Sequence, residues 1–128
     1  MQNGQTVRVM IDGKPRKITV AAVLYDEDDR QDQVGQGRFA KDANRWNELL
    51  ILRTSRGAVA IRGSWVTRWQ GESDRIAWGL AADDEGAARI LAAAAAGQES
   101  EEGLGIGADL ARHALKTLGW FDLVAVEA

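Results

Sequence analysis

The chain has 128 residues, of which 45% are hydrophobic and 27% are charged, and its formal net charge at neutral pH is −3. These values are typical of one ordered globular domain over residues 1–128 and argue against bulk disorder. Because the chain has no cysteine, disulfides, thiolate zinc sites and cysteine nucleophiles are excluded.

The first residues and the longest apolar runs bear on localisation. Residues 1–5 lack the basic and then apolar pattern of a signal peptide. No apolar run approaches the roughly 18 residues needed to cross a bilayer. Together with the lack of cysteine, these features predict a cytoplasmic, bacterial-type protein that is not inserted into a membrane.

The chain begins with a predicted hairpin. Residues 6–11 alternate as a half-buried strand, and residues 18–25 form a second strand that is apolar on both faces. Between them, Asp12-Gly13 is a dipeptide that favours a type I′ turn. A run of four carboxylates cannot be buried unpaired and is expected to end the second strand; it consists of Asp26, Glu27, Asp28 and Asp29.

A long connection is predicted from residue 26 to about residue 46. A loop of this length in a compact domain is uncommon and is usually functional. As an alternative, residues 39–46 form a short helix that lays Phe39 and Trp46 on the core.

The acidic run in this connection resembles a cation site only weakly. An EF-hand loop that starts at Asp26 would need glycine and glutamate where the chain has Gln31 and Gly37. We therefore expect a solvated acidic loop without a bound metal. The alternative is an acidic surface that mimics phosphate or contacts a basic partner.

Three more strands and two helices follow. The strands are predicted over residues 48–54, 58–69 and 75–80. A helix then begins at Asp83 or Asp84 and ends at Gly97, and a second helix covers residues 108–118 and ends at Gly119. An apolar run predicts a last strand over residues 120–127.

The predicted fold class is α+β, with an antiparallel meander of about five strands, two helices packed on one face and a C-terminal strand. The sheet region covers residues 5–80, the helical region 83–118 and the final strand 120–127. Strands 18–25 and 48–54 are apolar on both faces. Either the curled sheet and the 26–46 connection cover the second face, or a second copy covers it in a homodimer.

Charge is distributed unevenly along the chain. Residues 1–37 sum to −1, residues 38–75 to +4 and residues 76–128 to −6. The basic middle band contains eight basic residues, Trp46, Trp65 and Trp69, and Trp78 follows it. Arginine next to tryptophan suits a nucleic-acid surface, but it also occurs in ordinary twisted sheets.

The period of two in a strand separates these residues. Trp65 and Trp69 share the core face of strand 58–69, whereas Arg62 and Arg68 share the other face. Trp65 and Trp78 are expected to be buried, and the exposure of Trp46 and Trp69 stays open. What remains outside is a flat cationic face made of Arg53, Arg62 and Arg68.

Catalytic motifs are not evident. His113 is the only histidine and lacks an identifiable orienting partner, and none of the four serines lies in a nucleophile-elbow pattern. The glycines of residues 103–107 follow a helix rather than a strand, as expected for a linker and not for a dinucleotide site. We expect no enzyme activity, no cofactor and no metal.

The sequence favours a small non-catalytic binding or regulatory module that acts through a protein partner, such as an accessory factor of a phage or mobile element. The first alternative is a single-stranded nucleic-acid-binding protein that uses the cationic face. The second is an enzyme with a carboxylate-bound metal at residues 26–32. The protein is expected to be a monomer or a homodimer. The candidate partner-binding residues are Arg53, Arg62, Arg68, Trp69, Trp46, Asp26, Glu27, Asp28 and Asp29.

Overall fold

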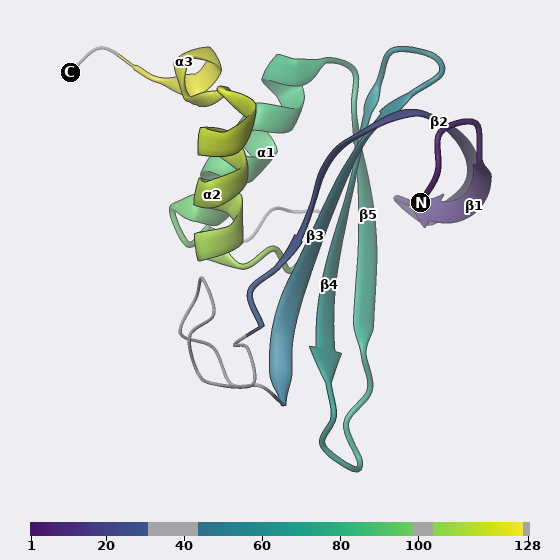
Figure 1. Cartoon of the computed structure of the whole chain (residues 1–128), viewed down its shortest axis with the longest axis vertical. Helices are drawn as coiled ribbons and strands as arrows, with labels where there is room; N and C mark the ends of the chain where they lie inside the picture. The colour runs from purple at the N-terminus through teal and green to yellow at the C-terminus, as the bar shows by residue number, and fades with distance from the viewer. Residues whose placement is uncertain (31–43, 99–103, 127–128) are drawn as a thin grey trace.

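The computed structural model describes residues 1–30, 44–98 and 104–126. Five antiparallel strands lie in one sheet in the order β1-β2-β3-β4-β5, as a meander (Figure 1). Among the described residues, three helices follow the strands along the chain. The elements are β1 (Thr6–Ile11), β2 (Lys14–Asp28), β3 (Arg45–Thr54), β4 (Val59–Thr67), β5 (Arg75–Ala81), α1 (Asp84–Ala95), α2 (Ala108–Leu118) and α3 (Phe121–Val124).

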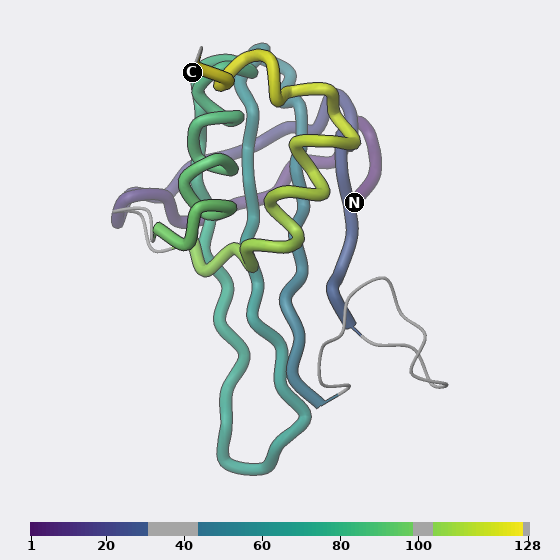
Figure 2. The backbone as a smooth tube through the Cα atoms, turned by 90° about the vertical axis from the view of Figure 1, so that its left-hand side faces the viewer, coloured from purple at the N-terminus to yellow at the C-terminus, as the bar shows by residue number. Residues whose placement is uncertain are grey.

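The β1–β2 hairpin folds back across the sheet. Asp12 and Gly13 both have positive φ, 53° and 74°, which confirms the predicted type I′ turn. Figure 2 shows α1 and α2 in front of the sheet and the hairpin running across behind it. Strand β1 contacts β5 without pairing with it, so the sheet is curled into a half-barrel. We call its two faces the helix side and the hairpin side.

Each face of the sheet has a core of its own. On the helix side, the inward residues of β3 and β4 pack against the helices; they include Leu49, Ile51, Val59 and Ile61, with Leu91, Leu110 and Leu115 from the helices. On the hairpin side, a smaller cluster consists of Ile11, Ile18, Val20, Leu50, Leu52 and Ala60. The two cores explain why β3 is apolar on both faces.

The helices begin and end as expected. The Asp83 side chain accepts a hydrogen bond from the Gly86 N–H at 2.8 Å and caps α1, and the chain leaves α1 at Gly97, with φ +75°. Helix α2 ends at Gly119, which has φ 70°. Among the described helices, none is both long and apolar enough to cross a membrane.

The predicted C-terminal strand is wrong. Residues 121–124 form the short helix α3, and the described chain after it is not part of the sheet. Trp120 is buried against the helix-side core, whereas Phe121 and Leu123 are about half exposed. The apolar run therefore reflects one buried anchor and not the alternation of a strand.

The connection after β2 is shorter than predicted. Strand β2 continues through Asp26, Glu27 and Asp28, because alternate side chains of the run remain accessible to solvent. Strand β3 already begins at Arg45, so Trp46 lies in a strand and not in a helix. Residues 39–43 of the alternative helix lie outside the described residues.

Part of the second face is covered by the β1–β2 hairpin. It packs over the upper part of this face, next to the β3–β4 turn (Figure 1). Most of the 26–46 connection, which we expected to cover this face, lies outside the described residues, and cover by a second copy stays a prediction.

Candidate functional site

The ends of β3, β4 and β5 extend below the helices (Figure 1). We call residues 44–48 and 62–78 the sheet extension. Cross-strand register places Leu50 opposite Arg62 and Arg62 opposite Trp78, so all three point to the hairpin side. Trp46 lies opposite Val66 and points to the same side.

Arginines stack on tryptophans on the hairpin side of the extension. The guanidinium carbon of Arg62 lies 5.8 Å from the centre of the Trp78 ring. Trp46 contacts two arginines, Arg30 at 4.5 Å and Arg68 at 5.4 Å. The expected separation of tryptophans from arginines therefore holds within β4 and fails between strands.

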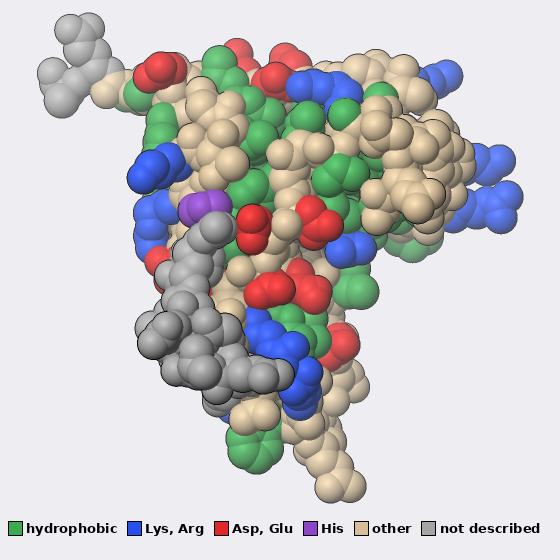
Figure 3. Space-filling model, in the orientation of Figure 1, with side chains coloured by type: hydrophobic (Ala, Val, Ile, Leu, Met, Phe, Trp, Pro, Cys, Tyr) green, Lys and Arg blue, Asp and Glu red, His purple; other side chains and the backbone are tan. Residues whose placement is uncertain are grey.

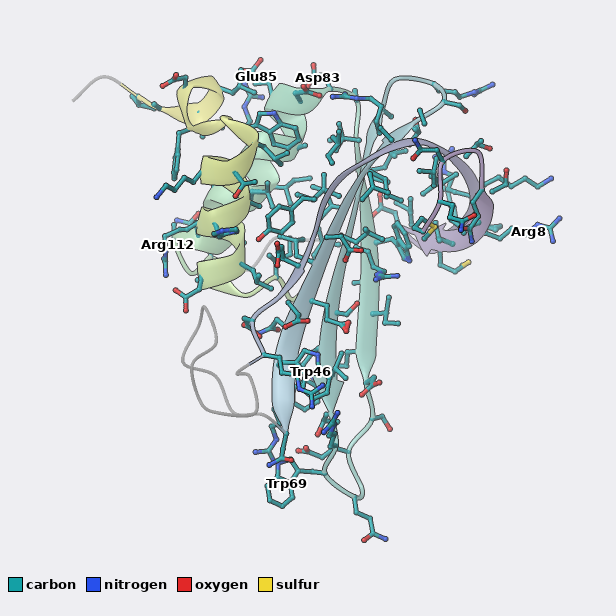
Figure 4. The ribbon with its side chains drawn as sticks, in the orientation of Figure 1. Arg8, Trp46, Trp69, Asp83, Glu85 and Arg112 are labelled. Carbon is teal, nitrogen blue, oxygen red and sulfur yellow. The ribbon has the colours of Figure 1, made fainter. Side chains whose placement is uncertain are left out.

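The helix side of the extension has two further pairs. Arg75 stacks on Trp65 at 5.4 Å, and Arg45 stacks on Trp69 at 5.3 Å. Trp69 lies at the tip of the extension (Figure 4) and is 49% exposed. The arginine–tryptophan pairs thus occupy both faces of the same end of the sheet.

A hydrogen-bond network holds the tip around Trp69. Arg45 donates from Nε and Nη2 to the two carboxylate oxygens of Glu72, both at 3.0 Å. The Thr67 hydroxyl donates to Glu72 at 2.6 Å and accepts from the Trp69 N–H at 3.1 Å. The hydrogen bonds from Arg45 and then Thr67 lower the pKa of the Glu72 carboxyl.

Arg53 does not belong to this surface. It lies opposite Val59 on the helix side and donates to both Asp84 oxygens, at 2.5 and 3.2 Å. The hydrogen bond to Asp84 raises the pKa of Arg53. The proposed flat face of Arg53, Arg62 and Arg68 is therefore wrong, because the orientation of β3 is opposite to the one assumed.

Eight of the described arginines fall into two groups, and Arg8, Arg16 and Arg56 belong to neither. One group pairs with carboxylates and includes Arg45, Arg53, Arg89 and Arg112. The guanidinium groups of the other group stack on tryptophan and form no hydrogen bond or ion pair within the described residues; this group consists of Arg30, Arg62, Arg68 and Arg75. The Nε atom of Arg62 is also buried without a partner among the described residues.

Burial of the tryptophans departs from the expectation. Trp65 and Trp78 are only partly buried, whereas Trp46 is buried and Trp69 is exposed. Trp78 packs against the hairpin-side cluster. A strand that is apolar on both faces does not reveal which of its faces the helices cover.

The acidic run is divided by strand geometry. Asp26 and Asp28 point to the hairpin side, where they line a shallow hollow with Glu27 and Glu48. Asp29 is fully buried and accepts hydrogen bonds from Asn47 N at 2.6 Å and Asn47 Nδ2 at 3.1 Å. Within the described ranges, no three acidic or histidine side chains are placed to hold a metal ion.

Charge at this end of the protein is mixed. Five arginines stack on tryptophan here, and six carboxylates lie near them; these are Asp26, Glu27, Asp28, Glu48, Glu72 and Asp74. Figure 3 shows acidic and basic groups next to each other on the visible face. The extension therefore does not carry a strongly positive field.

A hollow of about 420 Å³ lies on the edge of the extension, beside the Trp65–Arg75 pair. Its other lining residues include Asn47, Ile76 and Leu104. The Leu104 carbonyl packs directly over Gly63, which has no side chain to block it. The segment before α2 is therefore a packed part of the structure over residues 104–107, in addition to linking two helices.

Sequence reasoning missed several of these contacts. Arg30 and Arg45 were not candidates, and His113 was left without an orienting partner. The Tyr25 hydroxyl lies 2.7 Å from His113 Nδ1. The arginine–tryptophan pairs join residues on neighbouring strands, and only the register brings them together.

Comparison of the chain with known protein-family models, curated proteins and solved structures finds no match.

Proposed function

We propose that the protein is a non-catalytic binding or regulatory module that contacts a protein partner through the sheet extension, with Trp69 as the anchor. Trp69 is about half exposed, yet the Arg45 guanidinium, Glu72 and Thr67 fix the backbone and the ring around it. Tryptophan and arginine are enriched in the energetic centres of protein interfaces. A ring already held in place loses little conformational entropy when a partner binds.

The charge distribution supports a protein partner. A protein presents acidic, basic and apolar groups together, as the extension does. The exposed Ile76 adds an apolar contact beside Trp78, at 63% exposure. A polyanion would instead meet the carboxylates of Asp26, Asp28 and Glu48 next to the stacked arginines.

The test is quantitative affinity capture from a lysate of the source cells with the immobilised protein and Trp69→Ala. The matched control is Arg89→Ala, because Arg89 is an exposed residue of α1 that pairs only with Glu85 among the described residues. We expect a partner that the wild type and the control retain and that Trp69→Ala loses. Identical sets of captured proteins on all three columns would contradict the proposal.

A second candidate function is binding of single-stranded nucleic acid. It is supported by Arg30, Arg62 and Arg68, whose guanidinium donors stay available for phosphate while the tryptophans offer stacking surfaces. Titration with an oligonucleotide should then quench tryptophan fluorescence, and salt should abolish the quenching. No quenching at micromolar protein in low salt would rule this function out.

A further inference from the structure

A second hollow, of about 430 Å³, lies at the other end of the half-barrel, away from the sheet extension. The hairpin and the β3–β4 turn form its walls, and Leu80 of β5 closes one side. Cavities of this size at the mouth of a curled sheet commonly hold small ligands.

The charged residues that line this hollow are all basic. They are Arg16 and Lys17 from β2 and Arg56 from the β3–β4 turn. None of the three side chains has a hydrogen bond or ion pair with a described residue. Among the described lining residues there is no carboxylate that could neutralise them.

The register of the hairpin adds to this positive charge. Lys17 lies directly opposite Arg8 across β1 and β2, and like charges in this position destabilise a strand pair. Arg16 lies opposite Val9 and therefore points to the inner face of the hairpin, toward the hollow. Arg8 points away from the sheet (Figure 4). The hairpin thus separates an inward guanidinium from an outward one.

The remaining lining is polar on one side and apolar on the other. Thr54 Oγ1 accepts hydrogen bonds from the N–H groups of Arg56 at 3.3 Å and Ala58 at 3.2 Å, which fixes the turn that carries Arg56. Ser55 also belongs to the lining. Leu80 provides apolar surface and is 41% exposed, whereas Ile18 is buried in the hairpin-side cluster.

We propose that this hollow is a phosphate-binding site in which Arg16 and Arg56 hold the phosphate and the exposed apolar surface of Leu80 contacts the body of the ligand. Guanidinium groups bind phosphate through paired N–H donors, and the hydroxyls of the turn add further donors. The phosphate belongs to a small ester or to a nucleic-acid backbone. The site does not depend on Trp69 and stands apart from the proposed partner surface.

The test uses three probes, inorganic phosphate, adenosine monophosphate and a short oligodeoxythymidine, measured by titration calorimetry and by thermal unfolding. The variants are Arg16→Ala and Arg56→Ala. Arg8→Ala is the matched control because it removes the same charge from the same hairpin, on its outer face. All three positions are exposed, and circular dichroism verifies that each variant is folded.

We expect adenosine monophosphate or the oligonucleotide to bind saturably and to raise the melting temperature of the wild type. Arg16→Ala and Arg56→Ala should each weaken that binding about tenfold or more. Stronger binding of the oligonucleotide, with a further loss in Arg8→Ala, assigns the phosphate to a nucleic-acid backbone. Binding of the monophosphate that is indifferent to Arg8→Ala assigns it to a small ester.

Two results would overturn the proposal. One is the lack of binding of every probe at millimolar concentration. The other is an equal loss of monophosphate affinity in Arg8→Ala and Arg16→Ala, which would indicate a general charge effect. Neither result bears on capture of a protein by Trp69, because that experiment uses the opposite end of the sheet.

Discussion

The Tyr25 hydroxyl and His113 Nδ1 lie 2.7 Å apart and join β2 to α2. The two rings also pack, with centroids 5.7 Å apart. Because Tyr25 is buried and the bond links residues far apart in the chain, it fixes the position of α2 on the helix side of the sheet.

Tyr25→Phe removes this hydroxyl and keeps the ring. We expect the free energy of unfolding to fall by about 1 kcal/mol, since one partly buried hydrogen bond is lost without a cavity. Urea denaturation followed by circular dichroism measures the change. Thr117→Val is the control, because Thr117 lies 3.4 Å from the same nitrogen in a weaker contact. Equal stability of Tyr25→Phe and wild type would show that the bond does not matter.

Asp29 and Asp26 should respond differently to truncation. Asp29→Ala removes a fully buried carboxylate and leaves the partly buried Asn47 N–H without its acceptor, so we expect a loss of about 2–3 kcal/mol. Asp26 is exposed, and Asp26→Ala should change stability by less than about 0.5 kcal/mol. Denaturation midpoints of the two variants provide the comparison. Similar midpoints would mean that the acidic run is uniformly solvated.

Gly63 and Gly79 both face Leu104 and form a matched pair. A Cβ atom on Gly63 would lie 2.1 Å from the Leu104 carbonyl oxygen, whereas one on Gly79 would lie 3.0 Å from a side-chain methyl that can rotate. Gly63→Ala should therefore cost about 1–3 kcal/mol, and Gly79→Ala clearly less. Thermal unfolding of both variants measures which substitution costs more stability. A larger loss for Gly79→Ala than for Gly63→Ala would contradict the packing of the 104–107 segment.

Glu72, at the tip of the extension, should make the stability of the protein depend on pH. Its pKa is lowered by the hydrogen bonds from Arg45 and then Thr67. Because the pKa of Glu72 is lower in the folded state than in the unfolded chain, its ionised carboxylate stabilises the fold. This stabilisation is complete at a pH above the unfolded-state pKa of Glu72 and is lost as the pH falls through its folded-state pKa. An NMR titration of the Glu72 carboxyl should give a value below the ordinary one.

The control for Glu72 is Arg45→Met, which keeps the length of the side chain and removes the guanidinium. In this variant the Glu72 pKa should rise toward its ordinary value. A titration curve that is the same in the variant and the wild type would mean that Arg45 is not the cause.

The sequence predicted those elements whose ends have a local chemical cause. Asp12-Gly13 dictates its turn through positive φ. Asp83 marks the start of α1 through its side-chain carboxylate, and Gly119 marks the end of α2 through its left-handed backbone conformation. The prediction of a final strand was wrong because a short apolar run fits a strand and a buried helical anchor equally well. Here the anchor is Trp120.

The candidate site was harder to predict than the fold. The period of two within β4 correctly places Arg62 and Trp65 on opposite faces. However, Arg62 contacts Trp78 of β5, and Arg68 contacts Trp46 of β3. These contacts depend on the register between strands, which is a tertiary property. The orientation of β3 was also ambiguous, since its neighbouring residues 50 and 51 are both apolar and lie in the cores on opposite faces of the sheet.

The half-barrel stays unclosed, which has a consequence for how the protein behaves at high concentration. Strands β1 and β5 are the two ends of the sheet and could each pair with an edge of another molecule. Arg8 in β1 and Arg75 in β5 place a charge on each edge, and the hairpin adds Lys14 and Pro15. The basic hairpin thus disfavours edge-to-edge growth into fibrils. Removing its positive charges should increase aggregation under conditions in which the protein is still folded.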